Sequence, residues 1–260
     1  MSASLAAMAR HRRVVLAVAL ALSAGYPVGQ WFGSVGDEAL GDSWFFGLLA
    51  ALVMSLVLLI VSSLAQRPAV LIVRPEGPSF STPPSSPVVA TALLFTFAAS
   101  GHVASLVVSV KSHDLPLEKA VLAVAWIAGS GLLLAGAWHG LGVRLRPEGL
   151  RWRELTGSVS VPWEAIAPGC PLRPEVRAGT LALSYGRPEL VRRRGLVLSQ
   201  RLLRIDNVHA WFIADAIRHY VTHPERRAAI GTEGEYRRLL HAMRDELAEP
   251  TAGPGTDSNP

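Results

Sequence analysis

Arginines are the residues of this sequence whose type and spacing best fit a binding chemistry. After residue 141 they alternate with apolar residues in "VRLRPEGLRWREL", and three more stand in a row further along the chain. The planar guanidinium group donates hydrogen bonds in a fork that matches phosphate. The pattern therefore predicts contacts with anionic lipid head groups, and the candidate residues are Arg144, Arg146, Arg151, Arg153, Arg192, Arg193 and Arg194.

A plainer interpretation is that these arginines fix the orientation of the chain in a membrane and solvate one face of a strand. The first four directly follow a long apolar run, and basic residues beside a membrane span are enriched on its cytoplasmic side. Near an anionic leaflet each such residue contributes about 1 kcal/mol. The sequence therefore allows two interpretations of these arginines: they contact lipid head groups, or they serve only to orient the chain in the membrane.

Catalytic and metal-binding patterns are weak by comparison. Ser130 lies in "AGSG", which superficially resembles the G-x-S-G of rhomboid intramembrane proteases but lacks the first glycine. His102 and His139 are the histidines of the apolar runs, and we expect His102 to be a packed residue. The acidic residues are scattered, and Cys170 is the one cysteine, so no zinc spacing arises. We predict no enzymatic activity, no cofactor and no metal site.

Composition points to a membrane protein. Half of the 260 residues are hydrophobic, and the formal net charge is +5. Long apolar blocks fill the chain up to about residue 141, and charge is dense beyond it. Basic residues that flank membrane spans account for the positive charge, and no nucleic-acid-binding motif accompanies them, so we predict no nucleic-acid partner.

Four segments are long and apolar enough to cross a bilayer, which needs roughly 20 residues per helix. Together they make residues 1–141 a transmembrane region, with a cytoplasmic loop at 65–86. The expected spans are residues 14–31, 44–64, 87–110 and 120–141.

Basic residues near the span ends alternate along the chain. Arg12 and Arg13 precede the first span, and Arg67 and Arg74 lie between the second and third spans. The connection after the first span has acidic residues and no basic ones. The positive-inside rule then predicts a multi-pass protein of the plasma membrane with both termini in the cytoplasm.

The C-terminal half has the periods of strands followed by helices. Apolar and polar residues alternate on either side of the Pro147-Glu148-Gly149 turn, which indicates a hairpin, and further short strands follow. Helical spacing begins at Val208 and continues to Val221, and Pro224 should end that helix. We expect a cytoplasmic domain at 142–222, a helical extension at 223–249 with a helix at 232–247, and a disordered tail at 250–260.

The run "VRLRPEGLRWRELTGSVSVPWEAI" resembles the opening of bacterial PH-like domains, and "IRHYVTHPERRAAIGTEGE" resembles the end of actinobacterial membrane proteins that carry one. The matching residues include Gly149, Pro162 and Trp163, which we take as fold-defining. The resemblance implies a seven-stranded PH-like β-barrel capped by the helix at 208–221. In eukaryotic PH domains, basic residues around the first hairpin bind phosphoinositide head groups. The nearest counterparts here are Arg144, Arg146, Arg151 and Arg153, and the resemblance places Arg192, Arg193 and Arg194 elsewhere in the barrel.

The sequence repeats one short motif. Arg-Pro-Glu-Gly occurs at 74–77 and again at 146–149, each time after a pair of apolar runs. We read the two copies as tandem units, each a membrane hairpin followed by a strand and a turn. The strand "AVLIV" at 69–73 should then dock on an edge of the cytoplasmic sheet; a solvated loop is the alternative.

The predicted function is that of an integral plasma-membrane protein whose PH-like domain is a binding or assembly module. Its expected partners are the lipid bilayer, anionic phospholipid as a candidate ligand, and a protein partner or a second copy of the chain. A small transporter or channel subunit is the alternative, with His102 as its only near-candidate residue, and an intramembrane hydrolase comes third.

Overall fold

The computed structural model describes residues 11–32, 38–112, 117–197 and 200–248. The chain divides into two compact units. The helical unit comprises Met1–Pro68, Pro83–Gly142 and Arg153–Thr156. The sheet unit comprises Ala69–Thr82, Val143–Trp152 and Gly157–Pro260. The segment between the second and third long helices therefore belongs to the sheet unit, although the helices on either side of it belong to the helical unit.

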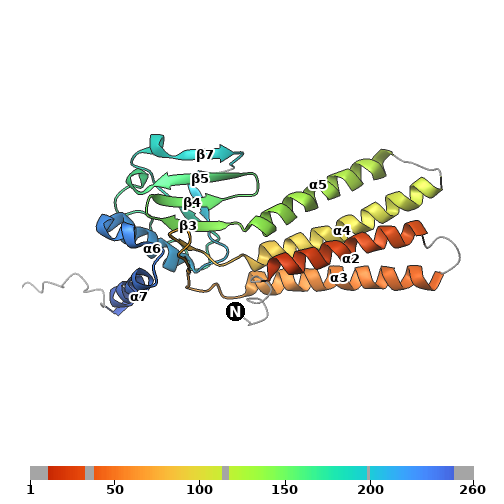
Figure 1. Ribbon diagram of the computed structural model, residues 1–260, viewed down its shortest axis with the longest axis horizontal. Coiled ribbons are helices and arrows are strands. Elements are labelled where there is room, and N and C mark those ends of the chain that lie inside the picture. The colour runs from red at the N-terminus through yellow and green to blue at the C-terminus, as the bar shows by residue number, and fades with distance from the viewer. Residues whose placement is uncertain (1–10, 33–37, 113–116, 198–199, 249–260) are drawn as a thin grey trace, which may run out of the picture. The chain divides into compact units, whose positions relative to one another are not determined.

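Four long helices form the helical unit: α2 (Arg12–Phe32), α3 (Glu38–Leu64), α4 (Ser86–Lys111) and α5 (Leu117–His139). All four are long and apolar enough to cross a membrane. The four helices predicted as spans are thus present, with bounds that differ from the prediction by up to six residues. α4 packs against each of the other three, and the bundle is seen in Figure 1.

Local sequence explains how α4 begins. Ser85 precedes the helix, its hydroxyl accepts a hydrogen bond from the backbone N–H of Val88, and Pro87 occupies the first turn, where its missing N–H costs nothing. The core of the bundle mixes small and large apolar residues: Leu16, Ala19, Val89, Ala92, Leu93, Phe97 and Ala137. Many other apolar side chains of the four helices are exposed, as expected for surfaces that face lipid.

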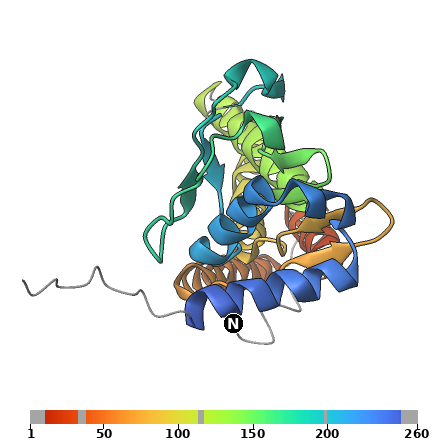
Figure 2. The ribbon, with the colours of Figure 1, turned by 90° about the vertical axis from the view of Figure 1, so that its left-hand side faces the viewer.

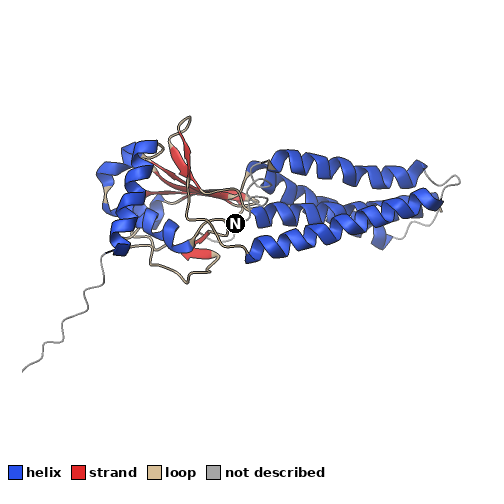
Figure 3. Ribbon diagram, turned by 90° about the horizontal axis from the view of Figure 1, so that it is seen from below, coloured by secondary structure: helices blue, strands red, loops and turns tan. Residues whose placement is uncertain are grey.

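Among the described residues, strands occur only in the sheet unit, apart from the first residue of β3 and the last of β4 (Figure 3). Six of them form one sheet in the order β1-β2-β3-β4-β5-β7, and β6 pairs with β8 in a second, two-stranded sheet. Their bounds are β1 (Ile72–Arg74), β2 (Ser79–Ser81), β3 (Gly142–Arg146), β4 (Gly149–Arg153), β5 (Gly157–Pro162), β6 (Thr180–Ala182), β7 (Arg192–Gly195) and β8 (Leu202–Arg204).

Two helices complete the sheet unit. α6 (Ala210–Thr222) buries Ile213, Ile217 and Tyr220 in the core that it shares with the sheet. It ends before Pro224, as predicted, and the short 3-10 helix η3 (Pro224–Ala229) leads to α7 (Glu233–Ala248). Both helices lie within one or two residues of their predicted bounds. His209 occupies the N-cap position of α6 and makes no side-chain cap hydrogen bond.

Two expectations from the sequence need correction. The described strands form an open six-stranded sheet and a separate strand pair rather than a closed seven-stranded barrel. The residues between α3 and α4 are not simply a loop, because 72–74 and 79–81 are strands of the sheet. The predicted docking of this segment is confirmed, but the strand that contacts β3 is β2 rather than 69–73. The tail expected to be disordered at 250–260 lies outside the described residues.

Candidate functional site

Alternation along the strands separates the sheet into an apolar face and an arginine-bearing face. In β3, Val143 and Leu145 are buried, whereas Arg144 and Arg146 are half-buried on the opposite face. In β4, Leu150 and Trp152 are buried and Arg151 is exposed. The buried residues all belong to one apolar core, so the arginines of both strands point away from it.

The β1–β2 hairpin adds another arginine to that outer face. Phe80 pairs with Leu145 and Ser81 with Arg144 between β2 and β3. Arg74 pairs with Ser79 between β1 and β2. Continuing the β2–β3 register by one residue places Ser79 opposite Arg146.

The two Arg-Pro-Glu-Gly copies thus make two turns of one sheet. Arg74 is the last residue of β1, and Arg146 is the last residue of β3. They flank Ser79 in a single row across three strands. Sequence reasoning did not include Arg74 among the candidate binding residues, although the repeated motif was a signal that could have identified it.

Hydrogen bonds fix some of these side chains. The Arg74 Nε donates to Ser81 Oγ at 3.1 Å. The Nε of Arg146 is buried and has no hydrogen-bond partner within the described part of the chain. A buried donor without a partner is unfavourable, so the position of the Arg146 guanidinium group has an energetic cost within the fold.

The three consecutive arginines of β7 divide between the two faces. Arg192 pairs with Ser160 and Arg194 with Ser158, whereas Arg193 pairs with the buried Val159. Paired residues share a face, so Arg192 and Arg194 lie on the outer face. Arg193 lies on the other face and is nevertheless exposed, because β7 is the last strand of the sheet.

We define the arginine face by these outer-face residues: Arg74, Arg144, Arg146, Arg151, Arg192 and Arg194. Strands β1, β2, β3, β4, β5 and β7 contain no acidic residue. Arg153 ends β4 and is exposed, but it falls in the helical unit as divided above and is not counted in the face. The face therefore has a net positive charge that the strands themselves do not neutralise.

The three fold-defining residues support the strands that carry this face. Gly149 has φ +151°, and a Cβ there would lie 2.2 Å from the carbonyl oxygen of Val161, so β4 and β5 approach only because Gly149 has no side chain. Pro162 ends β5. Trp163 is 1% exposed, and its Nε1 donates to the carbonyl oxygen of Arg146 at 2.9 Å. Trp163 therefore anchors the turn beside Arg146, and both Trp163 and Trp152 lie in the core of the sheet unit.

A group of contacts from the C-terminal helices fixes the β1–β2 hairpin (Figure 2). The Tyr236 hydroxyl accepts the N–H of Leu71 at 3.2 Å, and the rings of Tyr236 and Tyr220 lie 5.7 and 6.4 Å from that of Phe80. Gly231 has φ +96°, and a Cβ there would lie 2.4 Å from the N of Ser79. We call these residues the hairpin clamp: Leu71, Ser79, Phe80, Tyr220, Gly231 and Tyr236.

The hairpin is also fixed where the chain leaves it. Thr82 follows β2, and its backbone N–H donates to the carbonyl oxygen of Val143 at 3.0 Å. Its Oγ1 accepts hydrogen bonds from the N–H of Val143 at 3.1 Å and from Asn207 Nδ2 at 3.0 Å. Each of the three groups is buried. Buried hydrogen bonds of Thr82 thus attach the C-terminal end of the hairpin to the sheet.

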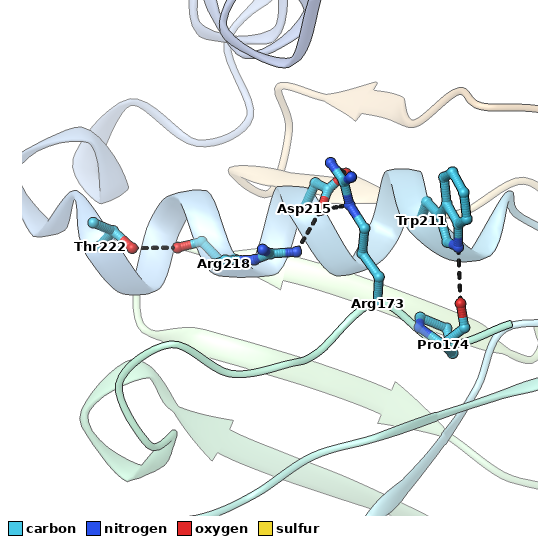
Figure 4. Close-up of polar contacts among 6 residues, drawn as sticks. All are labelled: Arg173, Pro174, Trp211, Asp215, Arg218 and Thr222. Atoms are coloured by element: carbon cyan, nitrogen blue, oxygen red, sulfur yellow. Dashed lines mark hydrogen bonds and ion pairs between the residues drawn. The ribbon is translucent and has the colours of Figure 1, made fainter. Parts of the chain in front are cut away.

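A second group of arginines, on α6 and the loop before β6, has a different environment (Figure 4). Arg173 donates to both carboxylate oxygens of Asp215 with its Nε and Nη2, at 2.9 to 3.2 Å. Arg218 donates to the same carboxylate at 2.6 Å, and Trp211 Nε1 donates to the carbonyl oxygen of Pro174 at 2.8 Å. These contacts hold the loop on α6, so Arg173 and Arg218 are structural and partly neutralised.

Burial shifts the pKa of two neighbouring groups on α6. The pKa of His219 is lowered from 6.5 to about 4, chiefly by burial and also by the nearby His223 and Arg226, whereas Glu225 opposes this shift. Burial also raises the pKa of Tyr220, to which the adjacent Glu235 carboxylate contributes. Both side chains are therefore neutral near pH 7, and the His219 ring has no charge to offer a ligand there.

The polar residues of the long helices serve packing in the structure. His102 stacks on Trp126 with ring centroids 5.1 Å apart, which confirms it as a packed residue. The Ser130 hydroxyl donates to the carbonyl oxygen of Ile127 in its own helix at 3.0 Å. His139 is the last residue of α5. Among the described residues, no group of three or more metal-binding side chains occurs.

No protein family, no curated protein and no solved structure matches this chain. The resemblance to PH-like domains therefore remains a prediction from the sequence.

Proposed function

We propose that this chain is an integral plasma-membrane protein whose sheet unit is a cytoplasmic binding module, and that the arginine face contacts anionic phospholipid head groups. The sheet with a C-terminal helix over its apolar face is the part of a PH-like domain that supports the family resemblance. The module carries no catalytic role in this proposal and needs no cofactor or metal.

The observation that carries the proposal is the concentration of positive charge on the arginine face, whose strands contain no acidic residue. Like charges on neighbouring strands repel one another, so such a face is costly unless an anion compensates it. Arg151, Arg192 and Arg194 of this face are exposed, and the guanidinium fork matches a phosphate oxygen pair. A phosphodiester head group supplies both the charge and the acceptors.

Chain connectivity favours lipid over a soluble anion. β3 begins three residues after α5 ends, and α4 begins five residues after β2 ends. A chain extends at most about 3.5 Å per residue, so Arg144 and Arg146 of β3 stay within a short tether of the end of α5, which is long and apolar enough to span a bilayer. Near an anionic leaflet, each contributes about 1 kcal/mol of attraction.

The two alternatives receive less support. A transporter or channel needs ionisable groups that line a path, and His102, the nearest candidate, stacks on Trp126. An intramembrane hydrolase needs an activated nucleophile, and Ser130 donates its hydroxyl hydrogen to its own helix. A protein partner with an acidic surface would use the same arginine face and is separated from lipid by the experiment below.

The test is the retention of phospholipid by the full-length protein purified in mild detergent, counted by native mass spectrometry. The variant replaces Arg74, Arg144, Arg146 and Arg151 by Gln. The matched control replaces four exposed arginines of the same unit by Gln: Arg177, Arg187, Arg204 and Arg237. We expect the wild type and the control to retain phosphatidylglycerol over phosphatidylcholine, and the variant to lose that preference.

Added salt should weaken the preference of the wild type, because interactions at an exposed face are screened within about 8 to 10 Å at physiological ionic strength. Equal retention of the two lipids by the wild type would contradict the proposal. Equal loss in the variant and the control would also contradict it, because net charge rather than the arginine face would then be responsible.

A further inference from the structure

β7 ends the six-stranded sheet in a run of exposed arginines. All four of its residues, Arg192–Gly195, are exposed, and its only sheet neighbour is β5. Ion pairs of the sheet unit include those of Arg173, Arg204, Arg218, Arg227 and Arg238. Within the described part of the chain, no such pair involves Arg192, Arg193 or Arg194.

The residue that follows this run is an exposed leucine. Leu196 is 78% exposed, whereas Val197 packs against the core of the sheet unit. The point at which the chain leaves the sheet is fixed by Gly157, which pairs with Gly195. A Cβ at Gly157 would lie 2.7 Å from the Leu196 carbonyl oxygen, so the two strands approach closely just before Leu196.

An exposed leucine alone needs no explanation, since folded proteins expose many apolar atoms. Leu172 is equally exposed, at 77%, and its neighbour Arg173 is paired with Asp215. Leu196 differs because the arginines before it have no such carboxylate. An apolar side chain beside unpaired basic residues is the composition of segments that insert into the boundary between head groups and acyl chains.

We propose that Leu196 inserts into the head-group boundary of the anionic leaflet while Arg192, Arg193 and Arg194 contact its phosphates. The inference rests on the proposed function, because Arg192 and Arg194 belong to the arginine face, and it names the part of the sheet unit that enters the lipid. The position of β7 at the sheet edge lets arginines of both faces reach one surface.

The experiment measures the depth of a fluorophore in the full-length protein reconstituted into nanodiscs. Cys170 is replaced by Ser, and a bimane label is attached to either Leu196→Cys or Leu172→Cys, which are matched in exposure. The nanodiscs contain phosphatidylcholine alone or with phosphatidylglycerol, and lipids with a spin label near the head group serve as quenchers.

We expect the label at 196 to be quenched more strongly, and to fluoresce at shorter wavelength, than the label at 172 in nanodiscs with phosphatidylglycerol. Replacing Arg192, Arg193 and Arg194 by Gln should reduce the quenching at 196 to that at 172. Equal quenching at both positions in the protein that keeps Arg192, Arg193 and Arg194 would overturn the inference. So would quenching at 196 that is the same with and without phosphatidylglycerol.

Failure of this inference is distinguishable from failure of the proposed function. If lipid retention depends on Arg74, Arg144, Arg146 and Arg151 but the label at 196 is not quenched, the insertion of Leu196 is wrong and the arginine face still binds lipid. If the label is quenched but those four arginines are dispensable for retention, Leu196 inserts and the wider proposal is wrong.

Discussion

Tyr236 and Leu71 lie 165 residues apart in the chain, and the phenolic oxygen of Tyr236 accepts the backbone N–H of Leu71 at 3.2 Å. Leu71 precedes β1 in the segment between two long helices, and Tyr236 is in the C-terminal helix α7. This contact joins the inter-helix hairpin to the far end of the chain. A substitution that displaces α7 should therefore also perturb the segment that leads into α4.

Replacing Tyr236 by Phe should free the hairpin locally. The substitution leaves the buried N–H of Leu71 without its acceptor, which costs about 1–3 kcal/mol. Hydrogen exchange at residues 71–74 should become faster. Tyr185→Phe removes a hydroxyl that donates to the carbonyl oxygen of Gln200, away from the hairpin, and should leave exchange at 71–74 unchanged. Unchanged exchange in Tyr236→Phe would show that this contact does not hold the segment.

Gly231→Ala should displace the hairpin because the new Cβ meets the backbone of Pro78 and Ser79, with 2.4 Å to the nearest atom. Gly169→Ala is the control, since Gly169 also has positive φ but has nothing within 4 Å of its Cβ position. Left-handed backbone costs alanine about 1–2 kcal/mol at either position. The thermal unfolding temperature should fall further for Gly231→Ala, and equal decreases would argue against close packing at Ser79.

Trp163→Ala should destabilise the sheet unit by about 3–5 kcal/mol, the usual cost of truncating a buried tryptophan. Trp163→Phe keeps most of the packing and loses the hydrogen bond to the carbonyl oxygen of Arg146, so its effect should be smaller. Denaturant unfolding followed at the sheet unit measures both. A sheet unit that unfolds at the same denaturant concentration in Trp163→Ala would refute the central place of Trp163 in the core.

The lowered pKa of His219 predicts how the stability of the sheet unit depends on pH. Its pKa is lowered from 6.5 to about 4, so between these values the unfolded chain binds more protons than the folded one. The free energy of unfolding therefore rises with pH through this range, and about 2 kcal/mol is lost on going from pH 7 to pH 5. Full stability is present above about pH 6.5.

The control for this dependence is His219→Gln, which cannot titrate. Its stability at pH 7 is lower or similar, but the part of the pH dependence that falls between pH 4 and 6.5 should shrink. Thermal unfolding at several pH values gives both curves. If the slope in this range were the same in both proteins, another group would be responsible.

The long helices and the first hairpin were predictable from the sequence because their signals are local. Apolar runs give the spans, and Pro-Glu-Gly between alternating residues gives the turn before Gly149. The alternation also placed Arg144, Arg146 and Arg151 on one face, whereas Arg193 was grouped with Arg192 and Arg194. Its face depends on the pairing with Val159, which no local pattern specifies.

The pairing of β2 with β3 and the hairpin clamp depend on contacts between distant residues. The predicted docked strand had its apolar residues at 69–73, and the three residues of β2, Ser79–Ser81, contain only one apolar side chain. Phe80 is fully buried because Tyr220 and Tyr236 approach it from helices more than a hundred residues later. The spacing of apolar residues along the sequence gives no indication of such a long-range contact.

The arginine face depends most on the pairing of β2 with β3, because that pairing brings Arg74 onto the same face as Arg144 and Arg146. Disulfide cross-linking in native membranes tests it directly. With Cys170 replaced by Ser, Ser81→Cys and Arg144→Cys are directly opposite, and opposite Cα atoms on neighbouring strands lie about 5 Å apart, within reach of a disulfide.

The control pair is Ser81→Cys with Arg151→Cys, which lies one strand further away, at roughly 10 Å. The structure predicts rapid cross-linking of the 81–144 pair under mild oxidation, detected as a peptide linking the two segments, and little of the 81–151 pair. Absence of the 81–144 link, with proteolysis of residues 69–82 in the folded protein, would contradict the pairing and the arginine face built on it.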